Sequence, residues 1–318
     1  MNLGLLSTAR INEKLAAGAG LVDEVHVVAI GSRDLVRAEA QAASLGVERA
    51  LGSYEAVLED PDVDAVYVAL PNSMHVDWSI RALEAGKHVL CEKPMARSVE
   101  PVERAFDAAE SAGRVLAEAF MWRHHPQAHK LVELLPGVGE LRLVRASFSF
   151  PLKGTGDLRA SAPLEGGALM DVGCYCVSGA RLVAGEPVQV FGVQTTGGGV
   201  DVRFSGVLRF EGDVLAEFDC GIDMANRHSL EVVGSEGSLF LADPWHSREA
   251  VLEVRAADGS VEEVRAEEAD PYACELRDFA AAVAGEREPL LGRADAVGQA
   301  RVIEALYRSA ESGELVRP

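Results

Sequence analysis

Short apolar runs alternate with amphipathic stretches through the first third of the chain, and this alternation restricts the fold more than any other feature. Five runs are apolar enough for strands buried on both faces: residues 3–6, 25–30, 65–70, 88–91 and 115–119. Asp34 and Ser98 are N-cap residue types, while Gly46 and Gly113 are typical helix stops. Strand–helix–strand units of this length form right-handed crossovers and a parallel sheet. The sequence therefore predicts a doubly wound α/β domain over residues 1–120.

Residues 121–318 follow a different pattern. Residues 141–150 alternate between apolar and polar types, and helical spacing returns from Pro271 onward. Four turn signals separate the strand-like runs between them: 197–199, 211–212, 234–237 and 258–259. We expect an α+β domain with a large open, mainly antiparallel sheet and helices, whose C-terminal helices can pack back on the first domain. Since no low-complexity linker intervenes, we expect the two domains to pack closely around a ligand cleft.

The charge and cysteine content exclude several classes of protein. The formal net charge is -20 and the pI is about 4.8, so the surface repels nucleic-acid backbones and anionic lipid heads. No run resembles a signal peptide or a membrane span. The five cysteines are odd in number and scattered, which argues against a disulfide framework. These features favour a cytoplasmic protein that does not bind nucleic acid or membranes.

The turn after the first apolar run has a composition suited to a dinucleotide. It reads Ser7, Thr8, Ala9, Arg10, Ile11, Asn12. Small residues here would let backbone amides at the helix start approach a pyrophosphate. The usual G-x-G-x-x-G is absent, because Ser7, Ala9 and Asn12 occupy the three glycine positions. An ordinary tight turn is the alternative, and the position between strand and helix favours the dinucleotide site.

The end of the second strand favours NADP over NAD. NAD enzymes usually carry an acidic residue there that accepts from the ribose 2′-hydroxyl. This chain has Ser32 and Arg33, with Arg37 one turn later. A hydroxyl and two guanidinium groups suit a 2′-phosphate. Asp34 leaves two alternatives open, because it could replace the missing acid or cap the helix.

Two further strand ends reach the same edge of the predicted sheet. Leu70, Pro71, Asn72 and His75 follow one strand, and Cys91-Glu92-Lys93-Pro94 follows the next. A proline cannot donate to a central ladder, so that strand must end at Lys93. The carboxyl edge of a doubly wound sheet is where ligands bind. Lys93 is therefore placed where a cation could reach a substrate hydroxyl.

Together these motifs resemble the glucose–fructose oxidoreductase/inositol dehydrogenase (Gfo/Idh/MocA) superfamily. The resemblance rests on the PN-x-x-H loop, the Glu92-Lys93-Pro94 turn and the later segment 166–175, and it runs along nearly the whole chain. Segments 7–11 and 119–123 are most similar to dimeric dihydrodiol dehydrogenases and NADP-dependent D-xylose 1-dehydrogenases. That subgroup tolerates loss of the glycine fingerprint. The resemblance implies an N-terminal Rossmann domain and a C-terminal domain for substrate binding and oligomerisation.

The resemblance also implies roles for individual residues. Lys93 corresponds to the catalytic lysine, Asp171 to a substrate-contacting aspartate and Tyr175 to the acid/base group. Asn72, His75, Glu92 and Arg123 would line the cofactor. Trp122 would cover the pocket, and Asp157 and Arg159 would reach substrate hydroxyls.

These assignments predict a hydride-transfer mechanism. NADP⁺ would accept the hydride from a sugar, polyol or dihydrodiol, while Tyr175 takes the hydroxyl proton. A free tyrosine titrates near pH 10, and a neighbouring ammonium such as that of Lys93 favours the phenolate. No metal is expected, because His124, His125 and His129 lack a matching second set of ligands.

Three questions stay open at this point. The same pocket suits a keto-sugar reductase using NADPH, and a non-catalytic nucleotide-sensing protein is a less favoured alternative. An open sheet needs its second face covered, which predicts a homodimer or homotetramer formed through that face. Val190, Val193, Val207 and Phe210 are the candidates to lie on it.

Overall fold

The computed structural model describes residues 1–153 and 156–318. These form two compact units: Met1–His124 with Asp270–Val297, and His125–Ala269 with Gly298–Pro318. The second segment of the first unit contains a helix that follows the large sheet in sequence. The division into domains at residue 120 stays a prediction.

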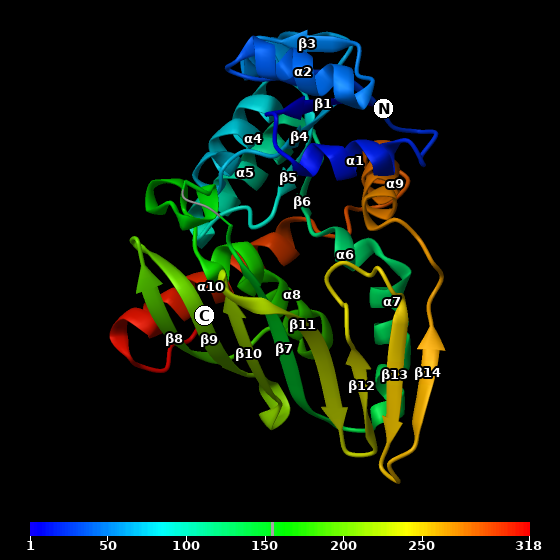
Figure 1. The fold of residues 1–318 in the computed structure, drawn as a ribbon, viewed down its shortest axis with the longest axis vertical. Coiled ribbons are helices and arrows are strands. Elements are labelled where there is room, and N and C mark those ends of the chain that lie inside the picture. Colours follow the sequence, from blue (N-terminus) through cyan, green and yellow to red (C-terminus); the bar gives the residue numbers. More distant parts are fainter. Residues whose placement is uncertain (154–155) are drawn as a thin grey trace. The chain divides into compact units, whose positions relative to one another are not determined.

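The first unit contains a six-stranded parallel sheet with strand order β3-β2-β1-β4-β5-β6 (Figure 1). This confirms the predicted doubly wound fold. Its strands are β1 Asn2–Leu6, β2 His26–Gly31, β3 Arg49–Leu51, β4 Ala65–Val68, β5 His88–Glu92 and β6 Leu116–Ala119. Its helices are α1 Ile11–Ala19, α2 Leu35–Leu45, α3 Tyr54–Glu59, α4 His75–Glu84, α5 Val99–Ala112, α6 Met121–His124 and α9 Pro271–Val283, with a 3-10 turn at Asn72–Met74. The strand runs predicted in this region are all present, whereas the three-residue β3 was not predicted.

The helix boundaries follow from their capping residues. The carboxylate of Asp34 accepts a hydrogen bond from the Arg37 amide at 3.3 Å and so caps α2. Gly46 and Gly113 end α2 and α5 in the left-handed conformation, with φ of 70° and 61°, which glycine adopts without a Cβ penalty. These boundaries were predicted correctly.

The second unit is built on an eight-stranded sheet with order β14-β13-β12-β11-β7-β10-β9-β8 (Figure 1). Its strands are β7 Leu141–Pro151, β8 Gln189–Gly197, β9 Val200–Arg209, β10 Leu215–Gly221, β11 Asp223–Gly234, β12 Gly237–Leu241, β13 Val251–Ala256 and β14 Val261–Arg265. Neighbouring strands are antiparallel except β7 and β10, which are parallel. The mainly antiparallel sheet is confirmed, and the predicted turns lie between its strands.

Helices cover one face of this sheet. Helix α8, Cys174–Ala184, contacts β7, β10 and β11 and buries Val144, Ala146 and Phe148. The second unit also contains α7 Pro126–Leu134, most of α10 Arg293–Ser312, a π-helical turn at Leu169–Gly173 and several 3-10 turns, among them Leu158–Ala160. Among the described residues, no helix is both long and apolar enough to span a membrane.

The residues predicted to lie on the open face divide between the two faces. Val193 and Val207 are exposed, at 56% and 44%, whereas Val190 and Phe210 are buried on the covered face. The prediction was wrong for Val190 and Phe210. Side chains alternate along a strand, so residues three positions apart, such as Val190 and Val193, must point to opposite faces.

Candidate active site

The turn between β1 and α1 replaces glycines with a network of side chains. Ser7 has a φ of 123°, a conformation that favours glycine. Its hydroxyl donates to the Ala69 carbonyl at 2.8 Å and accepts from the Ala9 amide at 3.1 Å. The buried Asn12 donates to the Ser7 carbonyl at 2.9 Å. The turn is thus held by side chains at two of the three positions where a fingerprint has glycine.

Two arginine side chains that follow β2 are exposed to solvent. Arg33 and Arg37 are both exposed. The buried Ser32 hydroxyl accepts from the Asp34 amide at 3.2 Å. The sequence left two roles open for Asp34, replacing the missing acid or capping the helix. The structure shows the second role, because the Asp34 carboxylate caps α2. Two exposed guanidinium groups, one directly after β2 and one in the first turn of α2, suit an anionic ligand group.

His75 joins the two loops that carry the predicted cofactor and catalytic residues. Its Nε2 lies 2.8 Å from the Leu70 carbonyl oxygen, and its Nδ1 lies 2.9 Å from the Pro94 carbonyl oxygen. Burial lowers the pKa of His75 to about 4, and the charge of Lys93 acts in the same direction. The imidazole is therefore neutral at pH 7. Since its side chain is buried, its observed contacts are those of a residue that positions the loops around Asn72 and Lys93.

Glu92, which was predicted to line the cofactor, is half-buried and lies near two buried glutamates that the sequence analysis missed, Glu118 and Glu275. It accepts a hydrogen bond from the Tyr67 hydroxyl. Burial raises the pKa of Glu275 well above its ordinary value, and the nearby charge of Glu92 raises it further. Glu118 contacts the turn that follows Lys93, where its Oε1 accepts a hydrogen bond from the Met95 amide at 2.7 Å. A sequence signal for these buried glutamates did exist, because each interrupts an apolar pattern. Glu118 does so in β6 and Glu275 in α9.

Two other predicted residues lie on α6. The Arg123 guanidinium pairs with the Asp295 carboxylate, with Nη1 3.5 Å from Oδ1, and only 11% of its side chain is exposed. Trp122 is almost fully buried. Their predicted contacts with the cofactor and the substrate stay predictions.

In the second unit, three predicted residues form an ionic cluster. The Arg159 Nε lies 2.8 Å from Oδ2 of Asp171, and its Nη1 lies 3.2 Å from Oδ1 of Asp157. The Asp171 carboxylate is the largest cause of a raised Arg159 pKa. About 40% of the Arg159 side chain is exposed. The structure therefore brings together the three residues predicted to contact substrate hydroxyls in this unit, with the guanidinium still accessible.

Tyr175 lies at the start of α8, directly after the π-helical turn that carries Asp171. Its ring meets Phe148 edge-on at 5.3 Å and Trp245 at 6.0 Å between centroids. Aromatic packing of this kind fixes the position of the ring. Lys93 belongs to the first unit and Tyr175 to the second, so their joint action stays a prediction.

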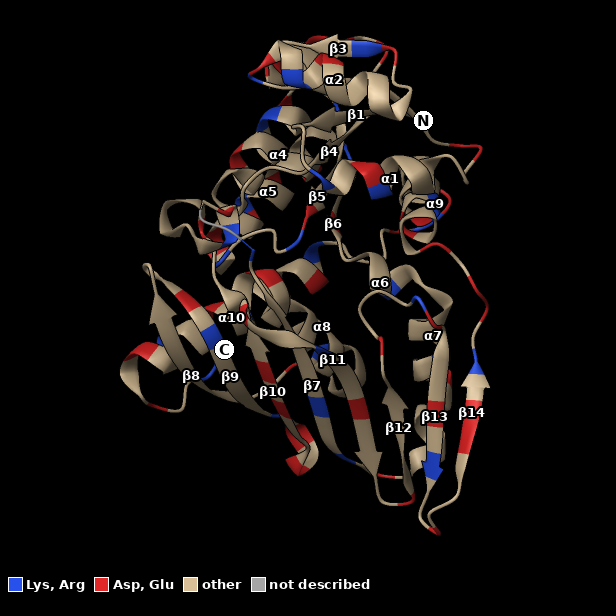
Figure 2. Cartoon of the chain, in the orientation of Figure 1, with Lys and Arg blue, Asp and Glu red and all other residues tan. Residues whose placement is uncertain are grey.

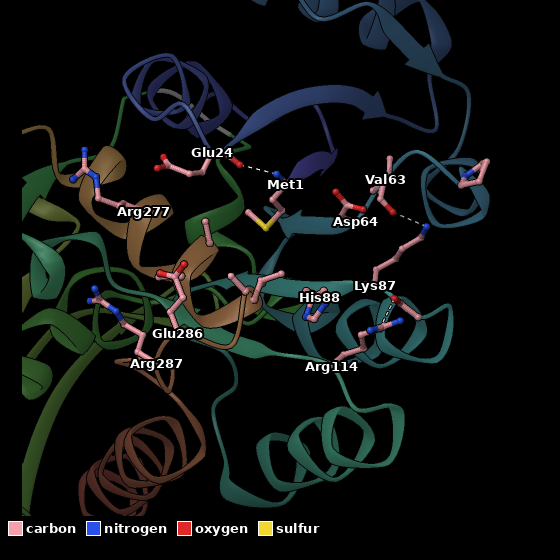
Figure 3. Close-up of a pocket in the computed structure, with 16 residues that line it drawn as sticks. Met1, Glu24, Val63, Asp64, Lys87, His88, Arg114, Arg277, Glu286 and Arg287 are labelled. Carbon is pink, nitrogen blue, oxygen red and sulfur yellow. Dashed lines mark hydrogen bonds between the residues drawn. The ribbon is translucent and has the colours of Figure 1, made fainter.

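A cavity of about 750 Å³ lies at the opposite edge of the parallel sheet (Figure 3). It is lined by residues at the amino ends of β1, β4, β5 and β6 and near the end of α9, among them Lys87, Arg114 and Arg277. Lys87 donates to the carbonyl oxygens of Asp60 and Val63, both at 2.7 Å. Dinucleotides bind at the carboxyl ends of such strands, so this cavity is not the cofactor site.

Comparison with known protein families agrees with this architecture. Residues 4–120 match the oxidoreductase family with an NAD-binding Rossmann fold, and residues 136–240 match the GFO/IDH/MocA C-terminal domain. This chain belongs to the Gfo/Idh/MocA family. It is accordingly an oxidoreductase, as the motifs around Lys93 and Asp171 predicted.

Individual members of the Gfo/Idh/MocA family match over nearly the whole chain. D-xylose 1-dehydrogenase (NADP(+)) 2 of Haloferax volcanii is 40% identical over 99% of both chains. Trans-1,2-dihydrobenzene-1,2-diol dehydrogenase of Danio rerio is 32% identical and covers 74% of this chain and 72% of its own. A 3-ketoreductase from Actinomadura kijaniata, solved in complex with NADP and TDP-benzene, superposes with a TM-score of 0.92 at 33% identity over 97% of both chains.

Proposed function

We propose that this protein is an NADP-dependent oxidoreductase that transfers a hydride between the nicotinamide and a CH–OH group of a sugar, polyol or dihydrodiol. The observation that carries the proposal is the carboxyl edge of the parallel sheet. There the Ser7 turn, the exposed Arg33 and Arg37, and the loops joined by His75 all lie at strand ends. The relatives named for xylose and dihydrodiol oxidation support the same substrate class.

The cofactor preference follows from the charge at the end of β2. Arg33 and Arg37 can each donate charge-assisted hydrogen bonds to a 2′-phosphate. The Asp34 carboxylate is held by the α2 amide, so it is poorly placed to accept from a ribose 2′-hydroxyl. NADP is therefore favoured over NAD. The nicotinamide supplies hydride chemistry when it is bound.

The protein's own residues supply the proton transfer and the orientation of the substrate. Tyr175 exchanges the proton of the reacting hydroxyl, and Lys93 stabilises the charge that develops on that oxygen. Leu70, Pro71 and Asn72 after β4, Glu92 at the end of β5 and Arg123 on α6 would bind the cofactor. On the second unit, Asp171 and Arg159 bind substrate hydroxyls through their paired charges, with Asp157 beside them. Trp122, on α6 of the first unit, also contacts the substrate.

The reverse direction is the second candidate function. The 3-ketoreductase similar to this chain reduces a keto group, as its name states, and a keto-sugar would use the same proton donor. A non-catalytic nucleotide sensor is less favoured, because such a protein does not require the pair of Lys93 and Tyr175.

Fluorescence titration with NADPH and NADH tests the cofactor, and a panel of aldoses, inositols, trans-diols and keto-sugars then tests turnover. We expect tighter NADPH binding and nicotinamide absorbance changes with an aldose or diol. Turnover with keto-sugars alone would establish the reductase instead. Binding without turnover across the panel would favour the sensor, and binding of neither nucleotide would refute the proposal.

We further propose that the protein is cytoplasmic and assembles as a homodimer or homotetramer through the open sheet face. Its five cysteines are buried free thiols, as expected in a reducing compartment. The open face carries the exposed Val193 and Val207 and a shallow hollow of about 580 Å³. Charged residues of both signs lie along its strands (Figure 2), and Arg145 pairs with Glu217 at 2.6 Å there. Paired charges and apolar side chains on one flat face suit a second copy.

A further inference from the structure

A cluster of two histidines and an aspartate in the second unit has no part in the proposed hydride transfer. His228 lies on β11, and Asp243 and His246 lie on the loop that follows β12. One ligand atom from each residue lies within 4.8 Å of the other two. We refer to these three residues as the His–Asp–His cluster.

The distances within the cluster match those between ligands of one metal ion. Oδ1 of Asp243 lies 3.1 Å from Nδ1 of His246 and 3.5 Å from Nε2 of His228. Zinc binds nitrogen and oxygen ligands at about 2.0–2.2 Å, which places neighbouring ligand atoms about 3–3.5 Å apart. The two imidazole nitrogens lie within 4.8 Å of each other.

The surroundings of the cluster are also those of a metal site. The Asp243 side chain is only 11% exposed, while His228 and His246 are 24% and 31% exposed. The Phe148 ring lies edge-on to both imidazoles, at centroid distances of 6.3 Å and 5.5 Å. An apolar residue on one side and solvent on the other leave a bound ion room for a water molecule as a further ligand.

In the structure, a cationic side chain lies beside the cluster and contacts two of its three residues. Nε of Arg248 lies 2.8 Å from Oδ2 of Asp243, and its Nη2 lies 3.4 Å from Nε2 of His228. The Arg248 side chain is 64% exposed, so it can move into solvent when a divalent ion binds. The Arg248 guanidinium would therefore compete with a metal ion for Asp243 and His228.

We propose that His228, Asp243 and His246 bind a divalent transition-metal ion of the zinc class. Imidazole ligands favour zinc, nickel and cobalt over magnesium and calcium, which prefer sites made of oxygen alone. Binding would fasten the loop after β12 to β11. That loop carries Trp245, whose ring packs against Tyr175, so the ion would stiffen one wall of the Tyr175 environment. The metal site does not depend on the proposed catalytic function.

Isothermal titration of the chelator-treated full-length protein with ZnCl₂, NiCl₂ and MgCl₂ tests this site. We expect one zinc or nickel ion per chain, no magnesium binding, and a zinc-induced rise in the unfolding temperature. Replacing either histidine by glutamine (His228→Gln or His246→Gln) should weaken binding at least about tenfold, because even outer-shell changes cost 10–100-fold. His129→Gln, at an exposed histidine of the same unit, should bind like the original protein.

The Arg248→Gln variant distinguishes zinc binding at the His–Asp–His cluster from zinc binding elsewhere on the protein. Removing the competing guanidinium should tighten zinc binding if the ion lies between Asp243 and His228, and a cysteine site elsewhere would not respond. Circular dichroism confirms that each variant folds. Zinc affinity that is unchanged in both histidine variants, or no zinc binding by the original protein, would overturn the proposal.

Discussion

The imidazole of His75 lies between two backbone carbonyl oxygens, that of Leu70 at 2.8 Å and that of Pro94 at 2.9 Å. One loop carries Asn72 and the other carries Lys93. A neutral imidazole carries one N–H, so His75 donates a hydrogen bond to one of these oxygens and packs against the other. It thereby lies between the two strand ends on which the proposed cofactor site depends. Because Leu70 and Pro94 are both buried, a replacement that cannot donate leaves a buried carbonyl oxygen without its hydrogen bond.

The stability of the protein should fall as the pH drops from about 6.5 to 4. The pKa of His75 is lowered to about 4 in the folded state, so the unfolded chain binds more protons in this window and protonation favours unfolding. The contribution is about 3 kcal/mol at 1.36 kcal/mol per pKa unit, and it is fully present above pH 6.5. Urea unfolding at several pH values measures it. His75→Gln should flatten this slope, whereas His26→Gln, at an exposed position, should not.

Substitutions at Ser7 should distinguish backbone strain from side-chain bonding. Ser7→Ala keeps the positive φ and removes the hydrogen bonds to Ala69 and from Ala9, so it should cost about 1–3 kcal/mol of unfolding free energy. Ser7→Gly loses the same bonds but relieves the strain, and it should cost less. Thermal unfolding and the KM for NADP⁺ both report the effect. An alanine variant more stable than the glycine variant would show that the positive φ carries no strain.

Replacing Arg33 and Arg37 by glutamine should reduce the preference for NADP. Each guanidinium lost from a 2′-phosphate removes a charge-assisted hydrogen bond of about 1.5–3 kcal/mol, or roughly 10–100-fold in affinity. NADH affinity should change little. Fluorescence titration measures both constants. Arg104→Gln on α5, which alters an exposed pair with Glu100, serves as the control, and equal losses for NADPH and NADH would contradict the assignment.

Tyr175→Phe should lower kcat by about 10²–10⁴-fold, because a positioned acid/base group contributes that much. The ring contacts with Phe148 and Trp245 remain, so stability and NADPH affinity should be nearly unchanged. Steady-state kinetics across pH should also lose one limb of the profile. If turnover stayed within a few-fold of the original, the proton transfer would belong to Lys93 or a water molecule.

Val207→Glu should disrupt the proposed assembly, because it places a charge on the open sheet face. A buried carboxylate without a partner is costly at an interface, so the dissociation constant should rise at least about tenfold. Val132→Glu on α7 is the matched control, since Val132 is exposed to a similar extent, at 43%, but lies on a helix and not on the open face. Light scattering over a concentration series measures the mass. An unchanged assembly in the Val207 variant would place the interface elsewhere.

The sequence by itself determined the elements, because their signals are local. Capping residues such as Asp34, glycine stops such as Gly46 and the strand-ending Lys93–Pro94 turn each act within a few residues. The order of parallel strands then brings their carboxyl ends to one edge, so the candidate cofactor residues could be named in advance. The antiparallel pattern of the second sheet was predictable in the same way.

Tertiary structure alone decided which distant residues meet. The pairing of Tyr67 with Glu92, the burial of Glu275 beside them, and the assembly of His228 with Asp243 and His246 join residues far apart in the chain. The faces of Val190 and Phe210 were likewise mispredicted, because the register of the sheet decides which side of a strand is covered. Local patterns specify backbone conformation, whereas contacts and protonation depend on packing across the whole fold.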